Sequence, residues 1–234
     1  CSSDLPMGTS IRDVIYKIGG GSSSGRPIKA VQLGGPSGGV IPESLFDTPI
    51  EYAAINATGA IMGSGGMIVM DDKTCMVDVA RYFTEFLTEE SCGKCAACRF
   101  GLDHLKKILD RICAGEGTMD DIPEMEKLFT VLDEGSLCGL GKSAANPVRS
   151  TLKHFKNEYE AHIFNKKCSA GVCKNLFAYK IDKNLCNGCT LCAVKCPEGA
   201  VSGEKKKPHA IDIEICIKCG ICFSLCKQEA IRVV

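Results

Sequence analysis

The 17 cysteines constrain the fold of this chain more than any other feature, because most of them stand in three closely spaced runs. Two runs near the C-terminus share the spacing C-x2-C-x2-C-x3-C, and a third run, far upstream, has only three cysteines. Such triplets suit cubane iron–sulfur clusters, since C-x2-C-x2-C wraps three thiolates around one cluster in a tight turn. Each triplet then needs a fourth thiolate from elsewhere in the chain.

The two C-terminal runs predict a pair of [4Fe-4S] clusters. In two-cluster ferredoxins the fourth cysteine of each run binds the cluster of the other run. We therefore assign one cluster to Cys186, Cys189, Cys192 and Cys226, and the other to Cys196, Cys216, Cys219 and Cys222. Zinc is the alternative for this residue type, but structural zinc sites favour paired C-x2-C elements over a triplet plus one.

The upstream run, Cys92, Cys95 and Cys98, predicts a third [4Fe-4S] cluster with Cys138 as its fourth ligand. Cys113 competes for that role, although its place near the end of a predicted helix is also typical of a buried thiol. Cys98 and Cys138 are both expected close to helix N-termini, where unpaired N–H groups favour an anionic cluster. Zinc is again the alternative on spacing alone.

Two of the remaining cysteines, Cys168 and Cys173, lie shortly after His162. One histidine and two cysteines can hold a structural zinc ion if a fourth ligand, Cys75 or Cys113, completes the set. The alternative is a pair of ordinary linker thiols. The other histidines are expected at the surface or in packing: His104, His154 and His209.

Charge and hydropathy exclude several classes of partner. The 28 Lys and Arg residues equal the 28 Asp and Glu residues, so the chain has no general footprint for nucleic acid or a membrane surface. No apolar run approaches the roughly 20 residues that cross a bilayer, and the first residues lack the pattern of a secretory signal. Secreted disulfides are another interpretation of the cysteines, but ligand-like triplets without a signal favour metal. We therefore expect a cytoplasmic protein of an anaerobe.

The N-terminal segment, residues 1–75, is rich in Gly, Pro and Ser, with strand-like runs at Ile28–Leu33 and Met67–Met70. We predict a small mixed sheet crossed by one helix, Ile11–Ile18, which ends at a run of three glycines. The glycines of Gly34–Gly39 lack the spacing of a phosphate-binding loop, so they predict a turn.

The rest of the chain divides into three segments. Residues 76–165 have helical periodicity and predict a bundle of four amphipathic helices, the last with Pro147 in its first turn. Residues 166–178 are a cysteine-containing hinge. Residues 179–234 contain an internal repeat, in which matching segments lead into Cys186 and Cys216. The predicted class is α+β: a β-grasp-like domain, a cluster-binding helical bundle and a two-[4Fe-4S] ferredoxin-like domain.

The upstream motifs resemble the flavin- and NADH-binding subunit of respiratory complex I. The resemblance rests on Glu90–Cys95, Cys98–Arg99, and Ser136–Cys138 followed by Asn146–Pro147. It implies a [4Fe-4S] cluster next to a flavin, held by the four bundle cysteines, and a preceding β-grasp domain of the soluble-ligand-binding type. The ferredoxin tail narrows the resemblance to the β subunit of multimeric NAD(P)-linked, often electron-bifurcating, [FeFe]-hydrogenases, or of related formate dehydrogenases.

This resemblance also implies cofactors and partners. Some members of the hydrogenase family are thought to bind zinc at the hinge, which favours Cys75, His162, Cys168 and Cys173 as its ligands. Other subunits, including one that carries a [2Fe-2S] cluster, and soluble ferredoxin are the expected partners. Ala97 departs from the usual proline of the family, and this affects only the rigidity of the turn. Residues 1–234 do not contain the flavin- and NADH-binding domain of the family, so we expect FMN and NAD(P) either in an N-terminal part of a longer subunit or in a partner, and we expect no role for Cys1. No FMN or NAD(P) site is therefore expected in this chain.

Three functions follow from these patterns. An electron-relay module of an NAD(P)(H)-linked oxidoreductase complex accounts for all three cysteine runs. A binding module that recognises a ligand or partner through residues 1–75, with structural metal sites, rests only on the glycine-rich loops. A cluster enzyme needs an open iron, and every cluster here finds four cysteines. We therefore expect the relay, with no catalytic residue in this chain, and a ferredoxin domain that moves about the hinge.

Overall fold

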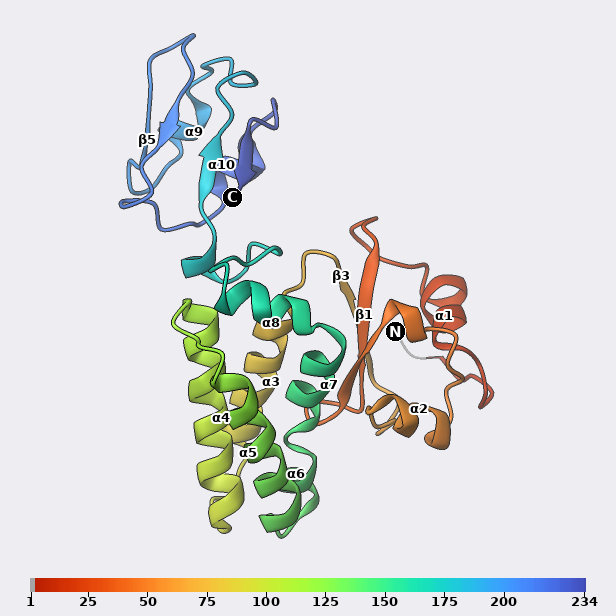
Figure 1. Cartoon of the computed structure of the whole chain (residues 1–234). Helices are drawn as coiled ribbons and strands as arrows, with labels where there is room; N and C mark the ends of the chain where they lie inside the picture. Colours follow the sequence, from red (N-terminus) through yellow and green to blue (C-terminus); the bar gives the residue numbers. More distant parts are fainter. Residues whose placement is uncertain (1–2) are drawn as a thin grey trace. The chain divides into compact units, whose positions relative to one another are not determined.

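The computed structural model describes residues 3–234, so Cys1 lies outside the described part of the chain. Two compact units are present: the first ends at Cys173, and the second runs from Lys174 to Val234. The first contains a sheet with helices on both faces, and the second contains short strands and short helices (Figure 1). Among the described residues, no helix is both long enough and apolar enough to cross a membrane.

A three-stranded sheet organises the N-terminal part of the first unit. The central strand β1 (Ile28–Leu33) pairs with β2 (Gly39–Pro42) on one side and β3 (Met67–Asp71) on the other. The predicted strands are confirmed, but the predicted mixed sheet is wrong, because both pairings are antiparallel. Gly34 and Gly35 turn the chain directly back from β1 to β2 with positive φ, so no crossover arises there.

Each face of the sheet is covered by helices. On one face lie α1 (Ile11–Asp13) with its continuation η1 (Val14–Ile18), and η2 (Glu43–Leu45) and α2 (Tyr52–Thr58). The predicted helix ends at Gly19 as expected, whereas α2 is an addition. This face buries a core of Ile11, Ile15, Ile28, Val31, Leu33, Ile41, Phe46, Ile55 and Ala60. Neighbouring residues of β1 alternate, so Ala30 packs on the opposite side with Val40, Met70, Met76 and Phe155.

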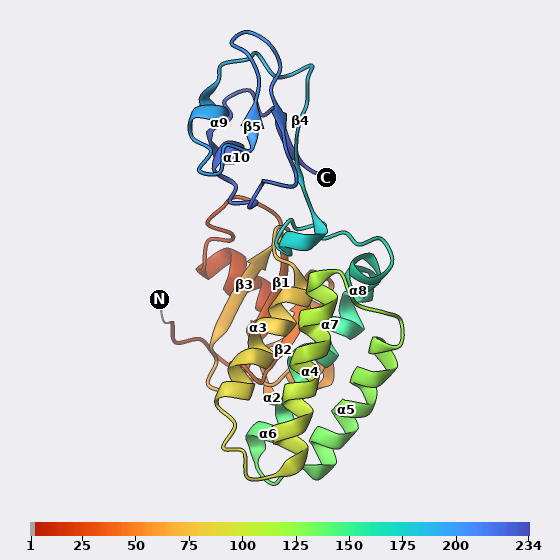
Figure 2. The ribbon, with the colours of Figure 1, turned by 90° about the vertical axis from the view of Figure 1, so that its left-hand side faces the viewer.

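The bundle packs against that second face. Its helices are α3 (Met76–Glu89), α4 (Ala96–Ala114), α5 (Asp121–Gly135), α6 (Gly139–Ser143), α7 (Asn146–His154) and α8 (Lys156–Ile163), as Figure 2 shows. The Ser150 hydroxyl of α7 accepts a hydrogen bond from the Val40 N–H of β2 at 2.9 Å, which joins bundle and sheet. Pro147 lies in the first turn of α7, as predicted.

The prediction of four helices is wrong in two places. The fourth helix is broken into α7 and α8 at Phe155, whose backbone (φ −131°, ψ 36°) is not helical. Burial of the Phe155 side chain in the core between sheet and bundle accompanies this break. In addition, α6 forms a short helix after Cys138, within a stretch too short for a clear apolar period.

The second unit is built from the two copies of the repeat. After η3 (Lys174–Leu176), strand β4 (Tyr179–Ile181) at the start of the first copy pairs with β7 (Ile231–Val233) at the end of the second. Likewise β5 (Val201–Ser202) ends the first copy and pairs with β6 (Ala210–Ile211). The short helices α9 (Leu191–Val194) and α10 (Ile221–Leu225) each contain the third cysteine of a triplet. Both copies therefore contribute to one core: Ile181, Val201, Cys222, Ala230 and Ile231.

Candidate metal centres

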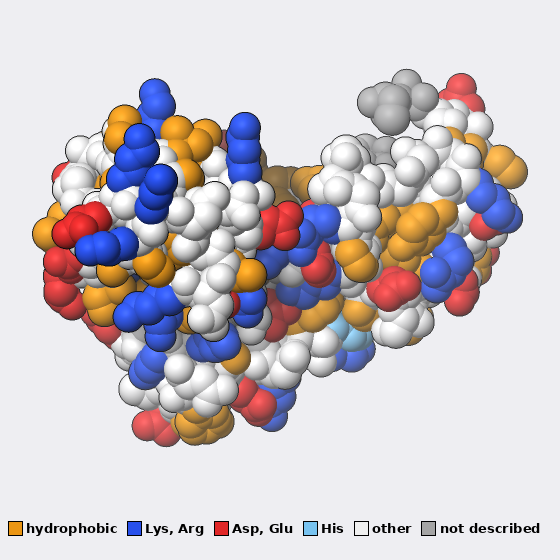
Figure 3. Space-filling model, turned by 90° about the horizontal axis from the view of Figure 1, so that it is seen from above, with side chains coloured by type: hydrophobic (Ala, Val, Ile, Leu, Met, Phe, Trp, Pro, Cys, Tyr) orange, Lys and Arg blue, Asp and Glu red, His pale blue; other side chains and the backbone are white. Residues whose placement is uncertain are grey.

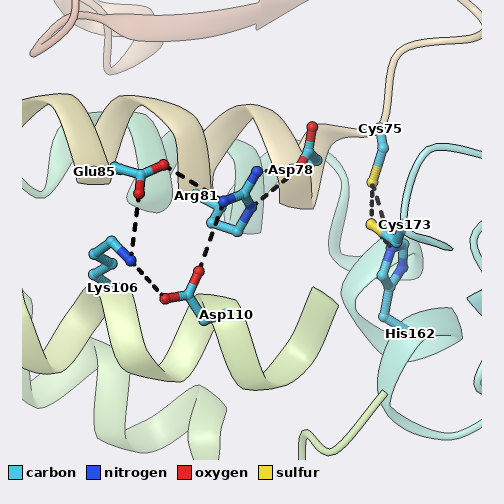
Figure 4. Close-up of polar contacts among 8 residues, drawn as sticks. All are labelled: Cys75, Asp78, Arg81, Glu85, Lys106, Asp110, His162 and Cys173. Carbon is cyan, nitrogen blue, oxygen red and sulfur yellow. Dashed lines mark hydrogen bonds and ion pairs between the residues drawn. The ribbon is translucent and has the colours of Figure 1, made fainter. Parts of the chain in front are cut away.

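The best-defined metal-ligand geometry is the four-residue group proposed as the zinc site. Its ligand atoms all lie within 4.8 Å of one another, and all four residues are buried: Cys75, His162, Cys168 and Cys173. Cys75 is the N-cap of α3 and His162 lies in the last turn of α8, so the group joins separate helices to the loop after α8. Figure 4 shows Cys75, His162 and Cys173 meeting there.

Hydrogen bonding fixes the orientation of His162. Its Nδ1 lies 2.7 Å from the Glu158 carbonyl oxygen, which can only accept, so Nδ1 carries the proton. Nε2 is then left with a lone pair, and it lies 3.4 Å from the sulfurs of both Cys75 and Cys173. Metal-binding histidines are held in the same way, by a backbone carbonyl at the nitrogen that does not bind the metal.

These distances fit a tetrahedral zinc ion. With Zn–S bonds of about 2.3 Å and a Zn–N bond of about 2.0 Å, tetrahedral geometry places two sulfurs about 3.8 Å apart and a sulfur and nitrogen about 3.5 Å apart. The Cys75 and Cys173 sulfurs are 3.8 Å apart, and both sulfur–nitrogen distances are 3.4 Å. The spacing of these three donors therefore fits zinc, and the Cys168 sulfur, within 4.8 Å of each of them, supplies a fourth donor.

The thiols of this group perturb one another. The pKa of Cys168 is lowered because Cys173 and Cys75 direct hydrogen bonds to its sulfur. The pKa of Cys75 is raised by its hydrogen bonds to Cys168 and Cys173 and by burial, and the pKa of Cys173 by its contacts with Cys113 and Cys168. Cys168 is therefore the thiolate of the group, and it accepts hydrogen bonds from the protonated thiols of Cys75 and Cys173. A divalent cation displaces the protons of these two thiols when it binds.

Cys113 was a candidate ligand both for the bundle cluster and for the zinc site. It lies next to the zinc group but is not one of its four members. It forms a second cluster with Asp78 and Cys173, within 4.8 Å of one another. Asp78 is engaged by Arg81 at 2.9 Å, at one end of the ion-pair network between α3 and α4 that Figure 4 shows. Cys75 and Cys113 were the two candidates for the fourth ligand. The structure places Cys75 with His162, Cys168 and Cys173, and we call these four residues the tetrad.

The bundle candidates gather at the opposite end of α4. Cys98 lies in the first turn of α4 and Cys138 is the N-cap of α6, so both stand at helix N-termini as predicted. The Leu137 N–H donates to the Cys95 sulfur, which lowers the pKa of Cys95 and ties the two cysteine segments together. Cys113 is fifteen residues along α4 from Cys98, a separation of about 22 Å, and this distance excludes it from the group.

The surroundings of Cys98 suit a buried anionic ligand. Burial raises the pKa of Cys98, while the Ser91 hydroxyl, 3.3 Å from its sulfur, lowers it. Cys92 and Cys138 are exposed, and Leu137 beside Cys138 is 82% exposed. One side of this group is thus packed in the bundle and the other is open.

Gly141, in the short helix α6 that follows Cys138, allows this segment to approach Cys98 closely. A Cβ added at Gly141 lies 2.5 Å from Ser136 atoms and 3.3 Å from the Cys98 Cβ, whereas one added at Gly139 meets nothing within 4 Å. Gly141→Ala is therefore expected to displace Cys138 and to lower iron incorporation at this site at least several-fold, and Gly139→Ala to leave it unchanged. Iron analysis after anaerobic reconstitution of both variants measures this, and equal iron contents contradict it.

In the second unit the cysteines line two cavities. One is lined by Cys216, Cys219 and Cys222 with Cys196 of the other copy, and also by Tyr179. The other is lined by Cys186, Cys189 and Cys192 with Cys226 of the other copy, and also by His209. The structure therefore brings together the same two sets of four that the exchange of fourth cysteines predicts, and each is a cradle of four sulfur donors suited to a cubane.

Backbone groups and charge complement these cradles. The N–H groups of His209 and Ala230 point at the sulfurs of Cys186 and Cys226, at 3.5 and 3.4 Å. The second unit has more Lys and Arg than Asp and Glu, and Figure 3 shows such basic side chains over its visible face. Positive side chains and N–H donors offset the negative charge of thiolate-bound clusters.

The three other histidines lie at the surface or in packing, as expected, but the sequence analysis did not predict that one of them, His209, lines a cysteine cavity. The His104 side chain is exposed and pairs with Glu124, and His154 is half-buried, in agreement with that expectation. His209, in contrast, is 1% exposed and lines a cysteine cavity. The signal available in the sequence was its place in the repeat, equivalent to Tyr179.

Comparison with protein families matches two of these regions. Residues 78–162 match the iron–sulfur binding region of NADH-ubiquinone oxidoreductase F, and residues 180–201 match a 4Fe-4S binding domain. The first match contains the four bundle cysteines and the second contains the first C-terminal run. These matches support [4Fe-4S] clusters as the cofactors and an α+β chain with a helical cluster-binding region and a ferredoxin-like segment.

Individual relatives agree. The chain is 49% identical over 206 residues to the HndC component of an NADP-reducing hydrogenase from Solidesulfovibrio fructosivorans, and the match covers 88% of this chain and 42% of that protein. It is 44% identical over 165 residues to the F 2 component of the NADH-quinone oxidoreductase of Rhizobium meliloti (strain 1021), and this match covers 70% of this chain and 39% of the relative. The chain thus spans less than half the length of these relatives.

A solved structure shows the same relationship. The crystal structure of an NAD+-reducing [NiFe]-hydrogenase in the H2-reduced state superposes with a TM-score of 0.59 at 29% identity, over 68% of this chain and 26% of that one. Over most of its length the chain is therefore similar to parts of subunits of NAD(P)-linked hydrogenases and NADH-quinone oxidoreductases, and two of its regions match iron–sulfur binding segments.

Proposed function

We propose that this chain relays single electrons between a flavin site and a ferredoxin or partner-subunit cluster in an NAD(P)(H)-linked oxidoreductase complex of the hydrogenase type, in the cytoplasm. The observation that carries the proposal is the pair of four-cysteine cradles in the second unit, each closed by the fourth cysteine of the other copy. A [4Fe-4S] cluster, when bound, accepts and passes on one electron at a time.

Each residue set has a role in this proposal. Cys92, Cys95, Cys98 and Cys138 hold the cluster on the flavin side, as in the complex I subunit that the motifs resemble. The two cradles of the second unit hold the remaining clusters, and all cysteines of the three sets act as ligands. No open iron is left for a substrate, so relay is favoured over catalysis on a cluster.

The tetrad at the end of the first unit is proposed to hold zinc as a structural ion. It comprises Cys75, His162, Cys168 and Cys173. Its last cysteine, Cys173, immediately precedes Lys174, where the second unit begins, so the ion anchors the base of the proposed hinge. The sheet domain is proposed to be of the β-grasp type, and a subunit with a [2Fe-2S] cluster and soluble ferredoxin are the proposed partners.

Electron counting tests the relay. The anaerobically reconstituted chain, titrated with a low-potential reductant while its visible absorbance is followed, is expected to take up about three electrons, one for each cluster. It should return them to an oxidised two-cluster ferredoxin added afterwards. Uptake of two electrons or fewer, or failure to reduce the ferredoxin, contradicts the proposal. Saturable binding of a small ligand to the sheet domain would favour the alternative function as a binding module.

A further inference from the structure

The repeat places one ring at an equivalent position in each copy. Tyr179 precedes Cys186 and His209 precedes Cys216 by the same number of residues, each followed by a matching Ile-Asp pair. Each ring lines the cavity of the other copy's triplet: Tyr179 that of Cys216, Cys219 and Cys222, and His209 that of Cys186, Cys189 and Cys192. The two cradles therefore differ chemically at a position where the repeat makes them geometrically alike.

His209 presents a buried polar atom to its cradle. Its Nδ1 lies 3.1 Å from the Lys207 carbonyl oxygen. Its Nε2 is buried and has no hydrogen-bond partner among the described residues. Buried polar nitrogens rarely stay unpaired, because burial without a partner loses the hydrogen bond to water and gains nothing in return. The cradle that His209 lines is where a cluster supplies sulfur acceptors.

The surrounding backbone holds the His209 ring in place. A Cβ added at Gly203 lies 2.6 Å from the His209 Cγ, so the ring packs directly on a backbone that has room for glycine only, at φ +155°. The loop between them is joined to the first cysteine run by the Lys206 N–H, which donates to the Gly188 carbonyl at 2.9 Å. The ring therefore cannot swing out of the cradle without moving this loop.

Tyr179, at the equivalent position of the other cradle, presents no buried unpaired polar atom to the cysteines. Its ring packs edge-on against Phe177 and tilted against Phe223, at centroid distances of 5.4 and 5.7 Å. Its hydroxyl lies beside Gly220, where an added Cβ is 3.1 Å away. It is partly exposed, so its hydroxyl can be satisfied by water. This cradle therefore has a mainly apolar aromatic neighbour where the first has a buried imidazole.

We propose that His209 donates a hydrogen bond from Nε2 to a sulfur of the cluster held by Cys186, Cys189, Cys192 and Cys226, and so raises the reduction potential of that cluster above that of its neighbour. The proposal rests on the proposed function, since it needs both clusters present. Donors to cluster sulfur stabilise the added electron, and they raise the potential for that reason. The two ring nitrogens face two acceptors, the Lys207 oxygen and the cluster sulfur, so His209, unlike His162, takes part as the doubly protonated imidazolium, which donates from both nitrogens. An electron that reaches the second unit then rests on the cluster beside His209.

The experiment is an EPR-monitored redox titration of the reconstituted full chain at one pH, with variants that move the donor. His209→Phe keeps a ring without a donor, and His209→Gln keeps an N–H near the place of Nε2. His209→Asn keeps an N–H near the place of Nδ1 but none near the place of Nε2. At the wild-type midpoint, we expect the ratio of reduced to oxidised cluster to fall about tenfold in the Phe and Asn variants, equivalent to about 59 mV. In the Gln variant the ratio of reduced to oxidised cluster should return to within about threefold of the wild-type ratio.

Tyr179→Phe is the matched control at the equivalent position, and it should leave the cluster beside His209 unchanged. The inference is overturned if His209→Phe keeps the wild-type ratio, if Asn and Gln behave alike, or if the other cluster shifts instead. Iron analysis of each variant separates the two proposals. A wild-type chain that lacks two clusters in this unit refutes the proposed function, whereas full clusters without a shift refute only the role of His209.

Discussion

Cys138→Ala is expected to abolish the cluster of the helical bundle and to leave the other two in place, so that the reconstituted chain loses about a third of its iron. The physical reason is that Cys138, at the N-cap of α6, is the cysteine that the fold brings to the Cys95 and Cys98 segment. A cubane with three thiolates and an exposed fourth iron is readily lost. Iron and sulfide analysis, with EPR of the reduced protein, measures the change.

Cys113→Ala is the matched control for this prediction. Cys113 was the competing fourth ligand on spacing, but it lies at the far end of α4, about 22 Å from Cys98. Its variant should retain all of the bundle iron. If Cys113→Ala lost the cluster and Cys138→Ala kept it, the arrangement of α4 and α6 would be wrong.

His162→Ala is expected to have the largest effect on stability. It removes one zinc ligand and leaves the three buried thiols of Cys75, Cys168 and Cys173 crowded together without an ion. Binding energy at a structural zinc site is folding energy, so we expect a loss of at least about 3 kcal/mol, or about 6–12 °C in Tm for a chain of this size. Zinc content should fall from about one ion per chain to none.

Thermal unfolding and zinc analysis of His162→Ala measure these effects, with His104→Ala as the control. His104 is another helical histidine, but its exposed side chain pairs with Glu124 at the surface, where such a pair contributes about 1 kcal/mol or less. A chelator should lower the Tm of the wild type toward that of His162→Ala. A wild-type protein that ignores the chelator and contains no zinc rules out the site.

The same site is expected to show a defined pH dependence. The pKa values of Cys75 and Cys173 are raised by the shared hydrogen bonds and by burial, so these thiols keep their protons when the metal is absent. Zinc binds thiolates, and it must therefore displace protons from them. Apparent zinc affinity should rise as pH rises and fall as pH falls. Isothermal titration calorimetry in two buffers of different ionisation enthalpy detects the released protons.

The sequence predicted those parts of the molecule that short-range patterns determine. Strand Ile28–Leu33, the helix that ends at Gly19, and the grouping of Cys196 and Cys226 with the triplet of the other copy all follow from periodicity, glycine or spacing. The tetrad was identified from leftover ligand residues, with Cys75 and Cys113 as alternatives. Only tertiary packing decides between them, because both stand at helix ends.

What the sequence could not predict depends on contacts between distant segments. The break at Phe155 accompanies burial of that side chain between the sheet and the bundle. The antiparallel direction of β3 is set by how the chain returns after α2, which periodicity does not encode. The sequence signals the place of His209 beside a cysteine cradle only through its repeat position, equivalent to Tyr179, and its buried Nε2 is visible only in the folded chain.

We propose that one chain holds three cubane clusters and one zinc ion and acts as an electron relay. Combined analysis of iron, acid-labile sulfide and zinc on anaerobically reconstituted protein, with EPR of the reduced sample, tests it most directly. We predict about 12 iron, about 12 sulfide and about one zinc per chain, with spin coupling between two of three reduced clusters. About eight iron with no uncoupled signal, or zinc in place of iron at any cysteine triplet, would contradict the account.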